Sequence, residues 1–574
     1  MERKNVMRLL IKSLLATTFF FCTATAVWGT DDKLASELHR KDLQGNINVI
    51  VRYKNVPTDT QHQKVVDGGG VLRHKFDLIK SGHYSVPAAL LEELAGDPEV
   101  EFVSPDRPVR GMLDLSAAAV NAAAAANYDL DGTGIGIAIV DSGVTEIADL
   151  RIAGGSATRV VYSQDFTGQS VTNDLYGHGT HVAGIAAGNS RTQEQLNGSF
   201  RFFKGMAENA SIINLRVLDN NGAGTDSNVI AAIQQAIALR SQYNIRVMNL
   251  SLGRAVSGSY TTDPLCQAVE AAWQAGIVVV VAAGNQGRNN NGAIGGYGTI
   301  TAPGNDPYVI TVGAMKTMNT PTRTDDNIAS YSSKGPTLFD HIVKPDIVAP
   351  GNQVRSTLSS TSSTLYTEYP STEILTAYYA TGYTKAISKA YYMLSGTSMA
   401  TPVVSGAAAL LIQQNPALTP DQVKARLMKT AYKSFPTASV ATDPSTGISY
   451  TSYYDLFTVG AGYLDIQAAL ANTDVASLPA LSPVAVFNSS TNTVSLVYGT
   501  NVVWGSNVVW GSNVVWGSNV VWGSNVVWDS STTQAFNVVW GSGLNGTIDP
   551  ANVVWGSTTG TVLEEMAVLT LGEN

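Results

Sequence analysis

The sequence predicts an α/β protein built around a mainly parallel sheet. Two runs, residues 134–140 (Gly-Ile-Gly-Ile-Ala-Ile-Val) and 277–283 (Ile-Val-Val-Val-Val-Ala-Ala), are almost continuously apolar, as strands buried on both faces of a parallel sheet are. Residues 403–412 are rich in Ala and Leu and follow a turn of small residues, which is typical of a buried helix. Of the 574 residues, 44% are hydrophobic, enough for a large core with accessory segments.

The N-terminus predicts export. Residues 1–26 combine early Arg and Lys residues, an apolar stretch and Ala24-Thr-Ala26, the pattern of a cleavable signal peptide. An uncleaved anchor is the alternative, although the apolar stretch is short for a membrane span. Without Cys22 only Cys266 remains, so the mature protein cannot form an internal disulfide. A net charge of −9 argues against a nucleic-acid partner.

A small α+β unit is predicted over residues 47–112. Residues 48–53 (Asn-Val-Ile-Val-Arg-Tyr) predict a strand, and Ser85-Val-Pro87 is expected to open a helix that stops at Gly96. Residues 100–103 alternate as an edge strand does.

Ser398 lies at the start of the predicted buried helix, within Ser395-Gly-Thr-Ser398-Met-Ala-Thr-Pro402. We place Pro402 in the first helical turn. Free backbone N–H groups and the positive end of the helix dipole would then surround the Ser398 hydroxyl. Such a place stabilises a negative oxygen, as an acyl-transfer nucleophile requires. A helix cap without chemistry is the alternative for this residue taken alone.

A nucleophilic serine needs a base, and His178 is the candidate. It occurs in Gly177-His-Gly-Thr-His181-Val-Ala-Gly184, where small residues suit the start of a packed helix. The helix dipole there disfavours the charged imidazole and keeps it available as a base. The spacing of His178 and His181 also allows a metal pair, but zinc needs a third protein ligand, and the sequence has no Cys cluster or HExxH.

Asp141 and Asn285 each follow one of the predicted strands. A carboxylate at the carboxyl edge of a parallel strand sits where open α/β sheets place their chemistry, so Asp141 can orient His178. Asn285 can donate its side-chain amide to a developing oxyanion. A turn-starting Asp and a loop Asn with left-handed backbone are the alternatives.

Together the four motifs resemble the signature blocks of the subtilisin-like serine proteases, in the chain order Asp, His, Ser. The resemblance covers residues 127–470 and implies a three-layer subtilisin-like fold with a mainly parallel central sheet. It implies that Ser398 is the nucleophile, His178 the general base and then acid, and Asp141 its orienter. Asn285 and the Ser398 backbone N–H would form the oxyanion hole. No member departs from the pattern, so an active serine endopeptidase is expected.

The resemblance also identifies residues 47–112 as a propeptide. In this family such a unit assists folding, acts as an intramolecular inhibitor and is removed by the enzyme itself. Cleavage is expected between residues 106 and 127. An N-terminal domain that stays attached is the alternative.

The substrate groove follows from the same resemblance. Peptide would lie as an added strand between the glycine-bearing edge 222–224 and the edge 251–253. The first specificity pocket would take its walls from residues 251–253 and 282–284 and its floor from Thr301. None of these residues is charged, which predicts broad cleavage with an apolar or medium-sized preference, and Arg254 is expected at the rim. A cis bond is predicted at Ala302–Pro303. The substrate-binding residues are therefore Gly222, Ala223, Gly224, Ser251, Leu252, Gly253, Ala282, Ala283, Gly284 and Thr301.

Two stretches look inserted. Residues 189–204 lie where relatives often bind calcium, but they show no dense run of oxygen ligands. Structural calcium therefore stays open without an assigned site, and no cofactor is required for the chemistry. Residues 358–393 are rich in Ser, Thr and Tyr and are either a part that overhangs the cleft or a structured surface loop.

The C-terminal region is repetitive. Residues 471–500 predict a linker. Asn-Val-Val-Trp-Gly-Ser then recurs within residues 501–557, and residues 558–574 form a tail. The repeats are β-prone and fit short hairpins, one continuous strand or a solenoid fragment. So much Val and Trp predicts packing on the catalytic domain, on another copy or on a surface, unless the segment is removed during maturation.

The sequence therefore predicts a secreted serine endopeptidase that acts on polypeptides and is made as a self-processed precursor. The alternative is a cell-surface adhesion protein whose tryptophan-rich repeats bind a polymer or the cell wall, and the same repeats would allow the enzyme to be retained at the cell surface.

Overall fold

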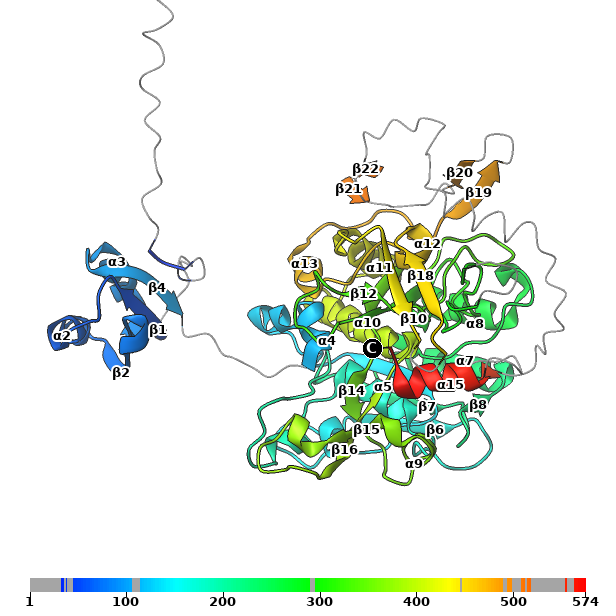
Figure 1. The fold of residues 1–574 in the computed structure, drawn as a ribbon, viewed down its shortest axis with the longest axis horizontal. Coiled ribbons are helices and arrows are strands. Elements are labelled where there is room, and N and C mark those ends of the chain that lie inside the picture. The colour runs from blue at the N-terminus through cyan, green and yellow to red at the C-terminus, as the bar shows by residue number, and fades with distance from the viewer. Residues whose placement is uncertain are drawn as a thin grey trace, which may run out of the picture. The chain divides into compact units, whose positions relative to one another are not determined.

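The computed structural model describes residues 33–35, 38, 45–105, 114–289, 295–443, 446–488, 493–497, 507–510, 514–517, 553–554 and 562–573. The chain divides into two compact units, residues 1–110 and 111–574, each with its own hydrophobic core (Figure 1). The predicted signal peptide lies outside the described residues.

Over its described residues, the first unit is a four-stranded antiparallel sheet with two short α-helices, as the α+β prediction requires. Its strand order is β2-β3-β1-β4, so β4 is at the edge, where the alternation of residues 100–103 put it. The helix α3 ends at Gly96 as predicted, but residues 81–87 belong to strand β3 and a 3-10 turn separates them from α3. The prediction of a helix opening at Ser85 was wrong because Tyr84 and Val86 are fully buried in this inner strand. The elements are β1 (Asn46–Tyr53), α2 (Asp59–Asp67), β2 (Val71–Phe76), η2 (Asp77–Ile79), β3 (Ser81–Pro87), η3 (Ala88–Leu90), α3 (Leu91–Gly96) and β4 (Val100–Pro105).

The second unit is built on an eight-stranded sheet of order β12-β11-β10-β9-β5-β7-β6, with β13 added beside β11. All its strand pairs are parallel except β11 with β12. Both apolar runs of the sequence lie in it, as β5 and β10. The strands are β5 (Gly136–Asp141), β6 (Val160–Asp165), β7 (Ser211–Arg216), β9 (Ile245–Leu250), β10 (Val278–Ala282), β11 (Ile310–Lys316), β12 (Asn327–Ile328) and β13 (Ile347–Pro350).

Helices cover both faces of this sheet. Successive strand residues point to opposite faces, and all six residues of β5 are buried. The helix α10 packs across β9, β10, β11 and β13 and against α5, while α7 and α8 pack on each other and on the central strands. This is the layered α/β arrangement predicted for a mainly parallel sheet. The helices are α5 (His178–Ala187), α7 (Asp226–Leu239), α8 (Pro264–Gln274), α10 (Thr397–Gln414), α11 (Pro420–Thr430), α12 (Leu456–Val459) and α13 (Ile466–Ala471).

The catalytic body extends beyond the predicted bounds 127 and 470. Before residue 127, α4 (Asp114–Ala119) and η4 (Ala122–Tyr128) contribute to its core, and the Val120 carbonyl accepts from Ile466 N at 2.9 Å. After residue 470, the linker prediction was wrong for residues 480–488, because Ala480, Ser482 and Ala485 are buried. Their backbone leads into the hairpin of β19 (Val484–Asn488) and β20 (Thr493–Val497). Composition alone does not separate a packed coil from a linker.

The tyrosine-rich insertion is an ordered part of the body. Its last strand, β16 (Ile387–Leu394), lies between β14 (Val354–Thr357) and β15 (Glu373–Leu375). Tyr391 and Tyr392 on β16 are fully buried. The remaining elements of the insertion are α9 (Thr364–Glu368), η8 (Pro370–Thr372) and η9 (Thr376–Tyr378).

The described parts of the repeats form strands. Two of them, β21 (Asn507–Trp510) and β22 (Val514–Gly517), pair antiparallel. A third, β23 (Val553–Val554), pairs antiparallel with β8 (Ala223–Gly224). The chain ends with α15 (Val562–Leu571), the red helix of Figure 1. The other repeats lie outside the described residues.

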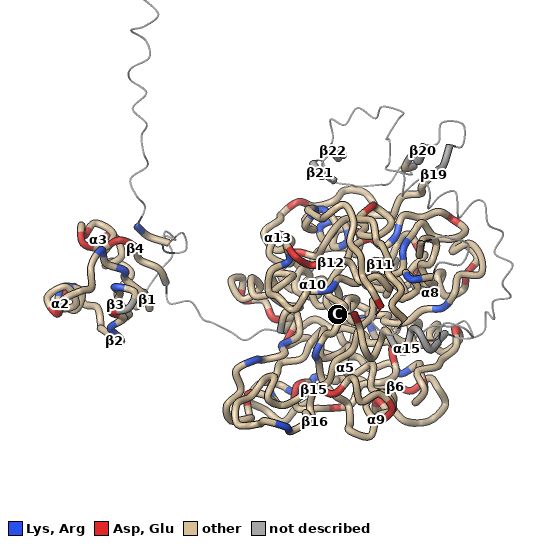
Figure 2. The backbone as a smooth tube through the Cα atoms, in the orientation of Figure 1, with Lys and Arg blue, Asp and Glu red and all other residues tan. Residues whose placement is uncertain are grey.

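Charge and hydropathy add two observations. Lys and Arg are interspersed with Asp and Glu along the second unit (Figure 2). Among the described helices, none has the length and apolar character needed to cross a membrane.

Candidate active site

The four residues predicted to carry the chemistry lie at the ends of packed elements. Asp141 is the last residue of β5 and His178 is the first of α5. Ser398 is the second residue of α10, and Asn285 follows β10. Because α5 packs on β5 and on α10, and α10 packs on β10, these ends meet at one side of the sheet.

Asp141 and His178 are in direct contact. The His178 Nδ1 and Asp141 Oδ1 atoms are 2.7 Å apart, and both side chains are fully buried. The same carboxylate oxygen accepts from Ser142 N at 2.7 Å. A histidine whose Nδ1 is held by a carboxylate presents its Nε2 in a fixed direction, which is the arrangement a general base needs.

A second carboxylate, Asp174, holds the start of the helix that carries His178. Its Oδ1 accepts from Gly177 N at 2.7 Å and from the Ser142 hydroxyl at 2.8 Å. Its Oδ2 accepts from Thr180 N at 2.8 Å. Asp174 therefore satisfies N–H groups that a helix N-terminus leaves open. Burial raises the pKa of Asp174 to about 6, although these hydrogen bonds act to lower it.

The sequence analysis missed Asp174. Its only signal was an Asp four residues before His178, which is typical of helix starts in general. Its role depends on Ser142, which follows Asp141 in the chain and donates to Asp174 while accepting from Gly179 N at 2.9 Å. The Ser142 hydroxyl thus links the strand end that carries Asp141 to the start of the helix that carries His178.

Pro402 lies further into α10 than predicted. The helix begins at Thr397, so Pro402 is past the first turn and cannot donate an N–H to the Ser398 carbonyl. The Ser251 hydroxyl fills that place, donating to the Ser398 carbonyl at 2.8 Å. Asn249 Nδ2 in turn donates to Ser251 Oγ at 2.9 Å, and the Ser405 hydroxyl donates to Asn249 Oδ1 at 2.9 Å. This buried chain fixes the nucleophile turn to β9.

Asn285 is fixed against the same turn. Its Oδ1 accepts from Thr397 N at 2.9 Å and from the Thr397 hydroxyl at 3.1 Å. Its Nδ2 therefore faces Gly396, where an added Cβ would lie 3.2 Å from that nitrogen. Gly396 has a φ of 146°, so the turn needs glycine for its backbone. The amide donor is held beside the turn that presents Ser398.

The Ser398 hydroxyl itself is buried and lies 3.2 Å from the Ser251 carbonyl, to which it donates. The contact between a nucleophilic hydroxyl and its general base is often long or poorly aligned until substrate binds. Rotation about one side-chain bond redirects this hydroxyl.

Thr301 lies close to three of the residues predicted as pocket walls, Gly253, Ala283 and Gly284. An added Cβ on Gly253 would lie 2.5 Å from Thr301 Oγ1, and one on Gly284 would lie 2.9 Å from Thr301 Cγ2. Thr301 N donates to the Ala283 carbonyl at 3.1 Å. Thr301 thus lies against both predicted walls, residues 251–253 and 282–284. The cis bond predicted at Ala302–Pro303 is confirmed, and cis bonds at Gly335–Pro336 and Lys344–Pro345 were not predicted.

Arg254 does not stand at an open rim. It is 5% exposed, and its guanidinium contacts Asp226 at 2.9 Å and Asp263 at 2.8 Å. Burial lowers its pKa, but the hydrogen bond and charge of Asp226 and those of Asp263 raise it above its usual range. Its positive charge is therefore balanced by these two carboxylates inside the fold. The predicted rim role was wrong because the sequence did not show these two carboxylates nearby.

His181 is a packing residue rather than half of a metal pair. Its Nε2 lies 3.0 Å from the Val354 carbonyl, and its ring meets Tyr392 edge-on with centroids 5.1 Å apart. Burial lowers the pKa of His181 to about 3, so it stays neutral. Within the described ranges, no group of three or more His, Cys, Asp or Glu residues is placed to hold a metal ion.

Comparisons with known proteins identify the family of the chain. A solved cold-adapted subtilisin-like serine proteinase is 29% identical, covering 53% of this chain and 85% of its own, with a TM-score of 0.37. Serine protease AprX of Bacillus subtilis is 36% identical over 366 residues, 62% of this chain and 74% of AprX. Subtilisin DY of Bacillus licheniformis is 32% identical over 339 residues, 59% of this chain and 91% of its own. The model of the subtilase family matches residues 132–460. The chain belongs to the subtilase family and is a serine endopeptidase of the subtilisin type.

Proposed function

We propose that this chain is a secreted endopeptidase that cleaves peptide bonds through Ser398, His178 and Asp141. The observation that carries the proposal is the buried Asp141–His178 contact of 2.7 Å beside the helix start that presents Ser398. Family membership supports the reaction type and polypeptide substrates.

In the proposed reaction, His178 Nε2 takes the hydroxyl proton as Ser398 Oγ attacks the substrate carbonyl. Asp141 stabilises the imidazolium through Nδ1 without taking the proton. His178 then gives the proton to the leaving amine, which departs as the acyl-enzyme forms. Water then attacks the acyl-enzyme while His178 takes its proton. The bond from the acyl carbon to Ser398 Oγ breaks, the acid product leaves, and His178 returns the proton to Ser398 Oγ.

The negative oxygen of each tetrahedral intermediate would be held by two donors, Asn285 Nδ2 and the Ser398 backbone N–H. The support is that the hydrogen bonds from Thr397 to Asn285 Oδ1 hold the side-chain amide before substrate arrives. A donor fixed in advance needs no reorganisation during the reaction.

A broad cleavage preference, apolar or medium-sized at the residue before the cut bond, follows from the proposed pocket. Its wall and floor residues are uncharged, and Arg254, which follows Gly253 in the chain, is paired with two carboxylates. A demand for an acidic or basic side chain would need an unpaired charge in the pocket.

We further propose that the first unit is a propeptide, which inhibits the enzyme until it is cut off. The support is that it has a core of its own and that the division between the units falls after Arg110, within the window expected for self-cleavage. Export through the N-terminal signal and retention at the cell surface through the repeats remain proposals from the sequence.

Labelling with a fluorophosphonate tests the enzyme proposal. Wild type should label and hydrolyse peptides, whereas Ser398→Ala should do neither. Ser398→Ala should also accumulate as the uncut precursor in a protease-free host. Equal labelling of both forms would refute the role of Ser398, and normal N-terminal processing of the variant would refute self-cleavage.

A further inference from the structure

The C-terminal end of the chain is built into the body that carries the active site. We define the C-terminal segment as the described residues 553–554 and 562–573. Its helix α15 packs against β16 and η8, and Val568 and Leu569 are almost fully buried, at 2% and 1% exposure. Figure 1 shows this helix in red, with the C-terminus of the chain marked beyond one of its ends.

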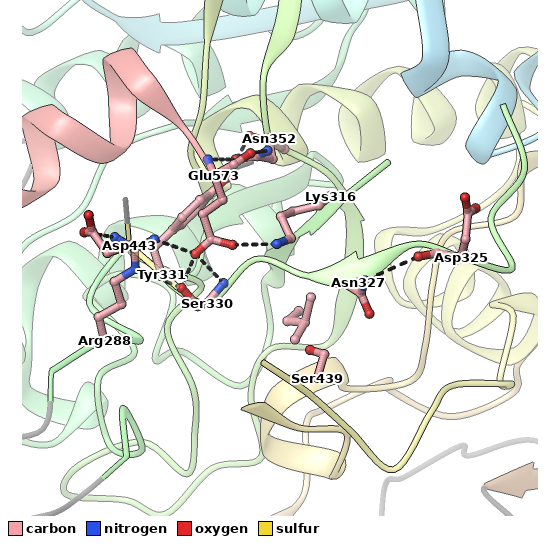
Figure 3. Close-up of polar contacts among 12 residues, drawn as sticks. Arg288, Lys316, Asp325, Asn327, Ser330, Tyr331, Asn352, Ser439, Asp443 and Glu573 are labelled. Atoms are coloured by element: carbon pink, nitrogen blue, oxygen red, sulfur yellow. Dashed lines mark hydrogen bonds and ion pairs between the residues drawn. The ribbon is translucent and has the colours of Figure 1, made fainter. Parts of the chain in front are cut away.

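The last residues occupy a socket that fits a glutamate. Glu573 Oε1 lies 2.6 Å from Arg288 Nη2 and accepts from Ser330 N at 3.0 Å and from the Ser330 hydroxyl. Its Oε2 lies 3.1 Å from Lys316 Nζ. The carboxylate therefore meets two cations and two uncharged donors in a place where it is 3% exposed (Figure 3).

Asn352 holds the backbone of the same residue. Its Nδ2 donates to the Glu573 carbonyl at 2.7 Å, and its Oδ1 accepts from Glu573 N at 2.8 Å. Gly572 before it has a φ of 67°, and an added Cβ would clash with the Ser395 hydroxyl and lie 2.9 Å from Asn352 Oδ1. The socket thus fits glycine at position 572 and glutamate at position 573.

The same segment touches the surroundings of the active site at three places. Ser395, three residues before Ser398, donates its N–H to the Leu569 carbonyl at 2.8 Å. Tyr176, two residues before His178, directs its hydroxyl at Met566 Sδ, 3.7 Å away. Val553 and Val554 pair with Gly224 and Ala223, which form the edge proposed to bind the substrate main chain.

We propose that the C-terminal segment is an intramolecular blocking segment of the substrate groove, in which the Glu573 socket is the anchor and the repeat strand β23 occupies the substrate edge. The inference rests on the proposed function, because it takes β8 as the edge to which substrate adds. A substrate and β23 cannot both pair with the free side of β8, since a strand edge offers one ladder of N–H and C=O groups.

The anchor explains why the two-residue strand β23 is long enough to compete with substrate for β8. A segment tied to the body competes at an effective concentration on the order of millimolar. It raises the KM of a competing substrate by a factor of one plus that concentration divided by its own Kd. With a Kd about a tenth of the effective concentration, KM rises about tenfold.

The test is to remove the strand while keeping the anchor. Val553→Pro/Val554→Pro deletes both backbone donors of β23, and proline does not pair within a ladder. The matched control is Val508→Pro/Val509→Pro in β21, which makes the same change in a repeat that pairs with β22. Intact mass confirms that each protein keeps its C-terminus, and thermal unfolding checks that each folds.

Two substrates distinguish an effect on substrate binding in the groove from an effect on the catalytic step. For a peptide with at least four residues before the cut bond, KM should fall about fivefold to tenfold in Val553→Pro/Val554→Pro. An N-acetyl amino-acid ester does not reach β8, so its hydrolysis should stay unchanged, and the control variant should match wild type with both substrates. A synthetic peptide of residues 551–557 should then inhibit the opened enzyme competitively.

Hydrogen exchange gives a reading that does not need activity. The Gly224 amide should exchange faster in Val553→Pro/Val554→Pro than in wild type; Ala223 N is less informative because it donates to Asp219 Oδ1 at 3.0 Å. Unchanged Gly224 exchange with unchanged KM overturns the blocking role, as does an equal gain in the control variant. Wild type that neither labels with a fluorophosphonate nor cleaves the ester would instead refute the proposed function, and Gly224 exchange would still decide whether β23 occupies the edge.

Discussion

The Ser251 hydroxyl should stabilise the nucleophile turn because Pro402 cannot. Ser251→Ala removes the donor to the Ser398 carbonyl at 2.8 Å and the acceptor of Asn249 Nδ2 at 2.9 Å. Both groups are buried, and a buried polar group left without a partner costs about 1–3 kcal/mol. We therefore expect Ser251→Ala to destabilise the protein by about 2–4 kcal/mol.

Replacing the proline should rescue part of that loss. Pro402→Ala supplies an N–H four residues after Ser398, where a helix hydrogen bond to the Ser398 carbonyl forms. In the Pro402→Ala background, Ser251→Ala should lower the free energy of unfolding only because Asn249 Nδ2 loses its acceptor, by about 1–2 kcal/mol. The difference is a coupling of about 1–2 kcal/mol between Ser251 and Pro402, up to about thirtyfold in an equilibrium constant, since 1.4 kcal/mol is a factor of ten.

The assay is a double-mutant cycle on enzyme inactivated with a fluorophosphonate, so that self-digestion does not distort unfolding. The free energy of unfolding of the four proteins is measured by equilibrium unfolding in urea, followed by fluorescence. Ser356→Ala is the matched control, because its buried hydroxyl donates to the carbonyl of His181 at 2.9 Å, away from Pro402. If Ser251→Ala costs the same with proline or alanine at 402, the hydroxyl does not replace the missing helix donor and the reasoning fails.

Three further predictions concern buried ionisable groups. Asp174→Asn keeps the shape of the cap but turns one acceptor into a donor, so kcat should fall about tenfold or more as His178 shifts, with about 1–3 kcal/mol lost in stability; an unchanged kcat would show that the cap does not position the base. Burial lowers the pKa of His181 to about 3. Below about pH 6.5 the unfolded chain therefore binds a proton that the folded protein does not, and the free energy of unfolding should fall by up to about 1.4 kcal/mol per pH unit as pH drops. His181→Gln should lose this slope, and an identical pH profile would contradict it. Burial raises the pKa of Glu573, but the charge of Lys316, the Ser330 hydroxyl and Arg288 outweigh it, so the pKa is lowered overall. Docking of the C-terminus is then stable above the usual carboxyl range and weakens as pH falls through the lower folded pKa. Glu573→Gln should mimic that loss by about 3 kcal/mol, read as faster limited proteolysis after residue 500 at neutral pH, and equal proteolysis of both forms would refute it.

The sequence predicted those features that local pattern determines. Apolar runs located β5 and β10, and polar residues at their ends located Asp141 and Asn285, because a parallel strand buried on both faces has few other places for a polar side chain. Ser398 and His178 were found from the small residues that open their helices. Each of these signals lies within a few residues of its target.

The features that sequence analysis missed depend on partners far away in the chain. Asp174 acts through Ser142, and Ser251 acts on a carbonyl that Pro402 leaves open. The burial of residues 480–485 depends on packing against other parts of the body, which composition does not reveal. The residues around Pro402 and Asp174 in the sequence do not show which distant groups contact them in the fold.

The C-terminal repeats show the same limit most clearly. The repeats at Asn507 and Asn552 share the sequence Asn-Val-Val-Trp-Gly-Ser, yet the first pairs with another repeat and the second with β8. Their own residues cannot make that difference. The two repeats differ in their distance along the chain from the Glu573 socket, and a tether raises the effective concentration of the strand nearest to its anchor. In the blocking segment that we propose, the repeat supplies the strand, and the Glu573 socket holds that strand close to β8.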